Sequence, residues 1–188
     1  MKNRVHSPVE VLDTTLRDGE QTPGVAFTPA EKLEIARLLL TKLHVDRLEI
    51  ASARVSEGED AAVRSIIGWA TKRDCAEQLE ILGFVDGGRS AEWIRGVGGS
   101  VLNLLAKGSE HHCRVQLRKT PARHCDDLCR EIESAVKKGL RVNVYLEDWS
   151  NGMRDNFAYV YNLVDKLRRL PVERFMLADT LGDRKSVV

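Results

Sequence analysis

A strand followed by a helix recurs along this 188-residue chain, and this repeat restricts the fold more than any other feature. The strand starts lie about 33 residues apart on average, close to the length of a strand–helix–strand unit. Strands that alternate with helices favour an α/β fold with a parallel sheet. The predicted strands are the apolar, β-branched runs Val9–Leu12, Val45–Ile50, Leu79–Phe84, Val101–Leu105, Arg141–Leu146 and Glu173–Ala178.

Three of the segments between these runs carry the apolar stripe of an amphipathic helix. The first opens at the capping box Thr28-Pro29-Ala30-Glu31, with proline at the first helical position. Gly139 follows the second segment and predicts its end. The predicted stripes are Leu33, Ala36, Leu40 and Leu43; then Leu128, Cys129, Ile132, Ala135 and Val136; and last Phe157, Val160, Tyr161, Val164 and Leu167.

Two architectures fit this alternation, a doubly wound sheet and a barrel. In Val45–Ile50, Leu48 and Ile50 share one face, whereas Arg47 and Glu49 share the other. A sheet covered by helices on both faces usually has strands that are apolar on both sides. Polar groups on one face, near the carboxyl ends of the strands, favour a barrel with its active site there. We therefore predict a (β/α)8 TIM-barrel fold of which about six of the eight units are present, as one partial domain over residues 1–188.

Composition excludes several classes of partner. Lys plus Arg (29) nearly balances Asp plus Glu (28), so the chain has no general attraction for nucleic acid or for anionic membranes. No apolar run approaches the roughly 20 residues that cross a bilayer. The first residues lack the apolar stretch of a secretory signal, so we expect a cytoplasmic protein with four reduced cysteines.

The segment after the first predicted strand carries the strongest chemical signal. Arg17-Asp18-Gly19 lies where a barrel places its first active-site loop. A carboxylate there can hold a hard divalent cation, and the neighbouring guanidinium can stabilise an oxyanion that forms on a carbonyl substrate. On spacing alone, an ordinary surface turn with an ion pair is the favoured interpretation, because charged turns are common.

Leu16-Arg17-Asp18-Gly19-Glu20-Gln21, with Lys32 after ten intervening residues, resembles the first signature of the 2-isopropylmalate, homocitrate and citramalate synthases. Those enzymes belong to the metal-dependent barrel superfamily that includes hydroxymethylglutaryl-CoA lyase. The resemblance covers about residues 5–182 and leaves 183–188 as an atypical end. Its further parts, in chain order, are Leu48-Glu49-Ile50-Ala51, Ser109 through Pro121, Glu147-Asp148 and Asp179-Thr180-Leu181-Gly182.

This resemblance implies a Claisen-type condensation of acetyl-CoA with a 2-oxo acid, as in amino-acid biosynthesis. It implies a divalent metal (Mg, Mn or Zn) with Asp18 as a ligand, and a homodimer in the full-length form. Arg17 would stabilise the developing negative charge, and Glu147 would orient the acetyl group or its proton acceptor. The implied substrate-binding residues are Gln21, Glu49, His112 and Thr180.

Each of these residues also has a purely structural interpretation. Glu49 would then be a polar residue of the barrel interior in an ion pair, and Glu147 an acidic strand end. His112 would be a solvated loop histidine, with His111 beside it as an alternative match to the family's histidine. Asp179-Thr180 would be a turn. Agreement of all of them in order and spacing favours the family interpretation.

The second signature of the family, a His-x-His pair that completes the metal site, is absent from this sequence. We therefore expect the N-terminal part of a longer barrel, with an incomplete metal site and two unpaired edge strands. Two other interpretations stay open. One is a lyase that runs the reverse carbon–carbon cleavage, and the other is a non-catalytic remnant or interaction module.

Overall fold

The computed structural model describes residues 9–53 and 57–180, and within them six parallel strands form a half-barrel. The strands follow one another in the sheet in chain order, without the reversal of order that defines a doubly wound sheet. The barrel prediction is therefore confirmed. The strands are β1 (Leu12–Asp13), β2 (Arg47–Ser52), β3 (Leu79–Gly83), β4 (Val101–Lys107), β5 (Arg141–Glu147) and β6 (Val172–Leu177).

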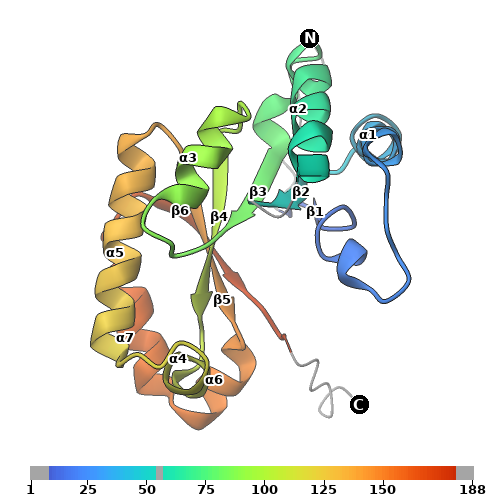
Figure 1. Cartoon of the computed structure of the whole chain (residues 1–188). Coiled ribbons are helices and arrows are strands. Elements are labelled where there is room, and N and C mark those ends of the chain that lie inside the picture. Colours follow the sequence, from blue (N-terminus) through green and yellow to red (C-terminus); the bar gives the residue numbers. More distant parts are fainter. Residues whose placement is uncertain (1–8, 54–56, 181–188) are drawn as a thin grey trace.

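Helices connect the strands on the outer side of the sheet. In Figure 1, α1 and α2 lie side by side at one end of the half-barrel, and α5 and α7 at the other. No helix in the described part of the chain is both long and apolar enough to span a bilayer. The α-helices are α1 (Pro29–Leu38), α2 (Glu57–Thr71), α3 (Arg89–Gly96), α4 (Glu110–Val115), α5 (Pro121–Lys137), α6 (Trp149–Asp155) and α7 (Phe157–Leu167); η1 (Gly19–Gln21) and η3 (Ala76–Gln78) are 3-10 turns, and η2 (Leu39–Leu43) is π-helical.

The ends of the main helices follow the local sequence. At α1 the predicted capping box is present, because the Thr28 hydroxyl accepts from the amide of Glu31 and the Glu31 carboxylate accepts from the amide of Thr28. At α5, Thr120 and Pro121 give the same Thr-Pro start without the reciprocal bond, since the Thr120 hydroxyl accepts from the amide of Arg123. Gly139 has a positive φ of 78°, as expected for a glycine just beyond a helix end.

The two faces of each strand have opposite character. Apolar side chains point outward into the layer of helices, where Leu48, Ile50, Leu104 and Val144 are fully buried. Polar side chains alternate with them and face the barrel interior. Glu49 is among these, fully buried yet hydrogen-bonded to Arg17 of the loop after β1 and to Asn103 of β4. This division places the hydrophobic core outside the sheet and leaves a polar interior for chemistry.

Parts of the predicted stripes and of the first strand are wrong. Leu43 is 70% exposed, because α1 passes into the π-helical turn η2 at Leu39 and the register of the stripe changes. Phe157 and Tyr161 also lie on the solvent side of α7, where their rings stack 5.8 Å apart. The first strand is Leu12–Asp13 rather than Val9–Leu12.

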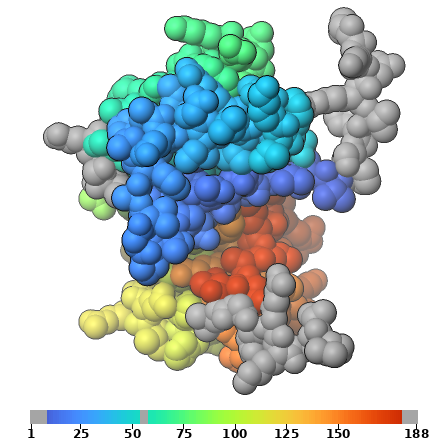
Figure 2. Space-filling view, turned by 90° about the vertical axis from the view of Figure 1, so that its right-hand side faces the viewer, coloured from blue at the N-terminus to red at the C-terminus, as the bar shows by residue number. Residues whose placement is uncertain are grey.

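The first and last strands are the edges of the half-barrel, as predicted. Among the described residues, β1 pairs only with β2, and β6 pairs only with β5. Figure 2 shows the segment before β1 (dark blue) against β6 (red). An ion pair joins them there, with an N–O distance of 2.7 Å between Arg174 of β6 and Glu10. This ion pair therefore links the amino ends of β1 and β6, the two edge strands of the half-barrel.

Candidate active site at the mouth of the half-barrel

The loop after β1 is shaped by one carbonyl group. The Thr14 carbonyl accepts hydrogen bonds from the amides of Arg17, Asp18 and Gly19 at 3.1, 2.8 and 3.2 Å. The Asp13 carboxylate accepts from the amide of Thr15 at 2.9 Å. This tight turn directs the Arg17 side chain into the barrel, where 13% of it is exposed, and leaves the Asp18 side chain 60% exposed at the rim.

Arg17 is held by two carboxylates and one ring. Its Nε donates to Glu49 at 2.5 Å, Nη1 donates to Asp18 at 2.7 Å, and the guanidinium lies 5.9 Å from the centre of the Tyr145 ring. Burial raises the pKa of Glu49, against the opposing effect of Arg17. Burial opposes the charge of Arg17, but Glu49, Asp18 and Tyr145 together outweigh this effect and raise the pKa of Arg17. The result is a fixed, partly desolvated cation at the floor of the mouth.

A buried amide links Glu49 to a second carboxylate deeper in the barrel. Asn103 Nδ2 donates to Glu49 at 2.7 Å and to Glu80 at 2.9 Å, and Asn103 Oδ1 accepts from Asn143 at 2.9 Å. Glu80 is in turn paired with Arg47 at 2.7 Å. Sequence reasoning missed Glu80 and Asn103. The signal was present, because both lie on the polar face of their strands at the two-residue period that identified Glu49.

Glu147, at the carboxyl end of β5, forms an ion pair with Lys107 at the carboxyl end of β4. Lys107 was not predicted as a site residue. Its backbone is also fixed, since the amide donates to His124 Nε2 at 3.1 Å and the carbonyl accepts from the Tyr159 hydroxyl at 2.8 Å. The Glu147 carboxylate is therefore held by a cation whose strand end is itself anchored.

A cavity of about 550 Å³ lies at the carboxyl ends of the strands and brings these groups together. It includes five of the predicted site residues: Arg17, Asp18, Gln21, Glu147 and Thr180. The Thr180 hydroxyl accepts from the Asp148 amide at 2.8 Å, which ties the end of β6 to the end of β5. The other lining residues are Thr14, Ser52, Leu82, Phe84, Leu105, Tyr145, Ala178 and Asp179.

Two predicted residues lie outside this lining. Glu49 is fully buried beneath Arg17, which it orients. His112 is on α4, and its Nε2 lies 3.4 Å from the Asp148 carboxylate. The backbone amide of His112 donates to the Ser109 hydroxyl at 3.2 Å. Its imidazole therefore reaches the loop after β5 rather than the lining of the cavity. His111 is exposed.

The metal-ligating capacity of the mouth is small. Asp18 offers one carboxylate at the rim, but no group of three His, Cys, Asp or Glu side chains suited to an ion occurs within 9–53 and 57–180. Because ligand number and geometry set affinity, these residues do not form a complete divalent-metal site. The four cysteines are free thiols, as predicted.

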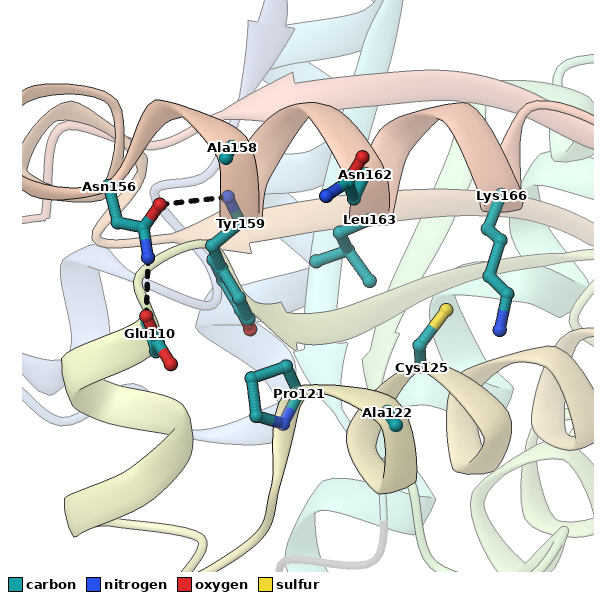
Figure 3. A pocket seen from close by; sticks show the side chains of 10 residues that line it. All are labelled: Glu110, Pro121, Ala122, Cys125, Asn156, Ala158, Tyr159, Asn162, Leu163 and Lys166. Carbon is teal, nitrogen blue, oxygen red and sulfur yellow. Dashed lines mark hydrogen bonds between the residues drawn. The ribbon is translucent and has the colours of Figure 1, made fainter.

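A second cavity, of about 360 Å³, lies on the outer surface between α5 and α7 (Figure 3). The Tyr159, Leu163 and Cys125 side chains line it, and Asn156 joins its rim to Glu110 through a hydrogen bond. None of the predicted site residues lines this cavity. The chemical groups of the chain therefore converge on the mouth instead.

The chain is similar to three kinds of synthase. It is 32% identical to an (R)-citramalate synthase of Methanocaldococcus jannaschii, 37% identical to a homocitrate synthase of Methanopyrus kandleri and 37% identical to a 2-isopropylmalate synthase of Solidesulfovibrio magneticus. These matches cover 93%, 93% and 96% of this chain but only 34%, 42% and 33% of the relatives. The chain thus spans about a third to two-fifths of their length.

Solved structures agree with this fold. A hydroxymethylglutaryl-CoA lyase from Pseudomonas aeruginosa superposes with a TM-score of 0.74 at 16% identity, over 93% of this chain and 59% of the lyase. At this identity the likeness shows the fold alone. A family model described as HMGL-like matches residues 8–186, which is nearly the whole sequence. The chain therefore belongs to the HMGL-like family.

Proposed function

We propose that this chain carries the substrate mouth of an enzyme that condenses acetyl-CoA with a 2-oxo acid. The observation that carries the proposal is the convergence of Arg17, Gln21, Glu147 and Thr180 on one cavity at the carboxyl ends of the strands. Active sites of TIM-barrel enzymes lie at that face. The relatives named as synthases of citramalate, homocitrate and 2-isopropylmalate support the same reaction type.

In this proposal, the acetyl methyl group loses a proton and attacks the keto carbon of the 2-oxo acid. The keto oxygen becomes an alkoxide and is then protonated, and water cleaves the thioester to release CoA. The Arg17 guanidinium, fixed by Glu49, would stabilise the charge that develops on oxygen. Glu147 would orient the acetyl group or its proton acceptor, and Gln21 and Thr180 would hold the carboxylate of the 2-oxo acid.

A divalent metal, where bound, would polarise the keto group as a Lewis acid. Asp18 is the described carboxylate placed to be one ligand, and the remaining ligands would have to come from outside the described residues. We therefore propose that the described residues position the 2-oxo acid and stabilise the negative charge that develops on its keto oxygen.

The wall of the mouth favours one class of 2-oxo acid. Leu82, Phe84 and Leu105 line it with apolar surface, whereas Arg17 is the one cation in the described lining. A second carboxylate on the substrate would lie against these apolar side chains without a partner, which is costly. We propose that the substrate has a short apolar group beyond the keto carbon, as pyruvate and 2-oxoisovalerate have, rather than the distal carboxylate of 2-oxoglutarate.

Release of the CoA thiol from acetyl-CoA tests this function, with each of these three 2-oxo acids and with Mg²⁺ or Mn²⁺. We expect release that depends on the 2-oxo acid, is faster with the apolar substrates, and is lost in Arg17→Met. A matched control, Arg64→Met, changes an exposed arginine of α2 and should keep the activity. No release with any of the three acids would contradict condensation by this chain. Release that is fastest with 2-oxoglutarate would contradict the proposed substrate class.

A further inference from the structure

Lys32 belongs to the sequence signature but does not line the mouth. It lies on α1, and only 2% of its side chain is exposed. A lysine this buried is rare unless it is paired, because taking an ammonium out of water is costly. The position of its partners therefore indicates what the residue does.

The Lys32 ammonium joins three elements. It lies 2.6 Å from Glu20 of η1 and 2.9 and 2.7 Å from the two carboxylate oxygens of Glu59 on α2. The second oxygen of Glu20 accepts from the amide of Phe27 at 3.0 Å, which closes the loop between η1 and α1. One buried cation thus fastens the loop to the packed pair of helices α1 and α2.

Glu20 lies between residues that line the mouth. Arg17 and Asp18 come three and two residues before Glu20, and Gln21 follows it directly. The first half of this loop is fixed by hydrogen bonds to the Thr14 carbonyl. In the second half, the amides of Gln21 and Thr22 donate, among the described residues, only to the nearby carbonyls of Asp18 and Gly19. Such local bonds open readily, so the attachment to α1 through Glu20 limits the motion of this half.

We propose that Lys32 is a positioning residue, which holds Gln21 at the mouth through the carboxylate of Glu20. This role rests on the proposed function, in which Gln21 holds the carboxylate of the 2-oxo acid. The ammonium of Lys32 stays away from the reacting atoms and acts by fixing the loop. The alternative is an ordinary structural ion pair that only joins α1 to α2 through Glu59.

The charge is best removed at Glu20, since Lys32→Met removes the buried cation itself and can unfold the α1–α2 pair. In Glu20→Gln, Lys32 keeps its pair with Glu59. We expect amide hydrogen exchange at Gln21 and Thr22 to accelerate about tenfold or more, with exchange in β4 and β5 changed less than about twofold. The matched control is Glu59→Gln, which removes the charge of the other carboxylate paired with Lys32. In this variant, exchange at Gln21 and Thr22 should stay within about twofold of the original rate.

A second readout connects the loop to binding. Pyruvate, titrated with Mg²⁺ present, should bind Glu20→Gln at least about tenfold more weakly, because the binding groups are no longer preorganised. Unchanged exchange at Gln21 and Thr22 would overturn the proposal. Equal acceleration across the loop, β4 and β5 would also overturn it, because this result would indicate a general loss of stability. If the loop loosens but the unaltered chain does not bind pyruvate, the positioning of the loop stands and the proposed function fails.

Discussion

The amide that bridges the two interior carboxylates gives a direct test of the polar interior. Replacing Asn103 with Leu keeps about the same volume but removes the donor to Glu49, at 2.7 Å, and the donor to Glu80, at 2.9 Å. It also removes the acceptor of Asn143 Nδ2, at 2.9 Å. All four side chains are fully buried, so water cannot replace the lost bonds.

The cost follows from these contacts. Each bond to a carboxylate contributes about 2 kcal/mol, and leaving the Asn143 donor unpaired costs about 1 kcal/mol more. Relief from burying the Asn103 amide offsets about 2 kcal/mol of this loss. We therefore expect Asn103→Leu to lower the free energy of unfolding by about 3 kcal/mol. The loss should be smaller at pH 5 than at pH 8, because the mutation raises the pKa of Glu49 further and a protonated carboxyl no longer needs the donor.

Urea unfolding followed by circular dichroism at both pH values measures this difference. Asn143→Leu is the matched control, because Asn143 makes one neutral bond and its Oδ1 is buried without a partner in the described part of the chain. The control should cost less than about 1 kcal/mol. Equal losses for the two variants, or a loss for Asn103→Leu that grows toward pH 5, would refute the bridging role of Asn103.

Three further predictions concern residues around the mouth and the helices. Burial lowers the pKa of His124 from 6.5 to about 4. Because the unfolded chain takes up a proton at this histidine before the folded chain does, the free energy of unfolding should fall by about 3 kcal/mol between pH 6.5 and pH 4. In His124→Gln, urea unfolding should show a fall that is about 3 kcal/mol smaller over this range. Gly152→Ala should lower the free energy of unfolding by about 3 kcal/mol or more, since the new Cβ would lie 2.0 Å from the Gly108 carbonyl oxygen. Gly68→Ala, at an exposed position inside α2, should instead raise the free energy of unfolding by about 0.5–1 kcal/mol, and the melting temperature with it. Lys107→Met should slow thiol release in the condensation assay without lowering the melting temperature by more than about 3 °C, and an unchanged rate would show that the ion pair with Glu147 is not needed.

Much of the fold follows from the sequence, because local signals and the sheet agree. The six strands, the start of α1 and the end of α5 were predicted from β-branched runs, the capping box at Thr28 and Gly139, whereas the Thr120-Pro121 start of α5 was not predicted. The exposure of Leu43 was not predictable from periodicity. The helix there changes from α to π winding, and a stripe drawn at 3.6 residues per turn then points to the wrong side.

The site divides in the same way. The resemblance to the synthases identified all five lining residues that were predicted: Arg17, Asp18 and Gln21 through one contiguous motif, and Glu147 and Thr180 through its continuation at the fifth and sixth strand ends. The partners of these residues come from other strands, so no contiguous motif contains them. Lys107 and Asn103 lie on the inward face of β4, but only the register of the sheet shows that they meet Glu147 and Glu49.

We propose that the 2-oxo acid binds at the mouth of the half-barrel and not in the cavity between α5 and α7. Titration of the ¹⁵N-labelled chain with pyruvate in Mg²⁺, followed by NMR, tests it most directly. We expect chemical-shift changes at Arg17, Asp18 and Gln21 and at the carboxyl ends of β5 and β6, and we expect these changes to be lost in Arg17→Met. Chemical-shift changes confined to the cavity between α5 and α7, or no changes at millimolar pyruvate, would contradict binding at the mouth.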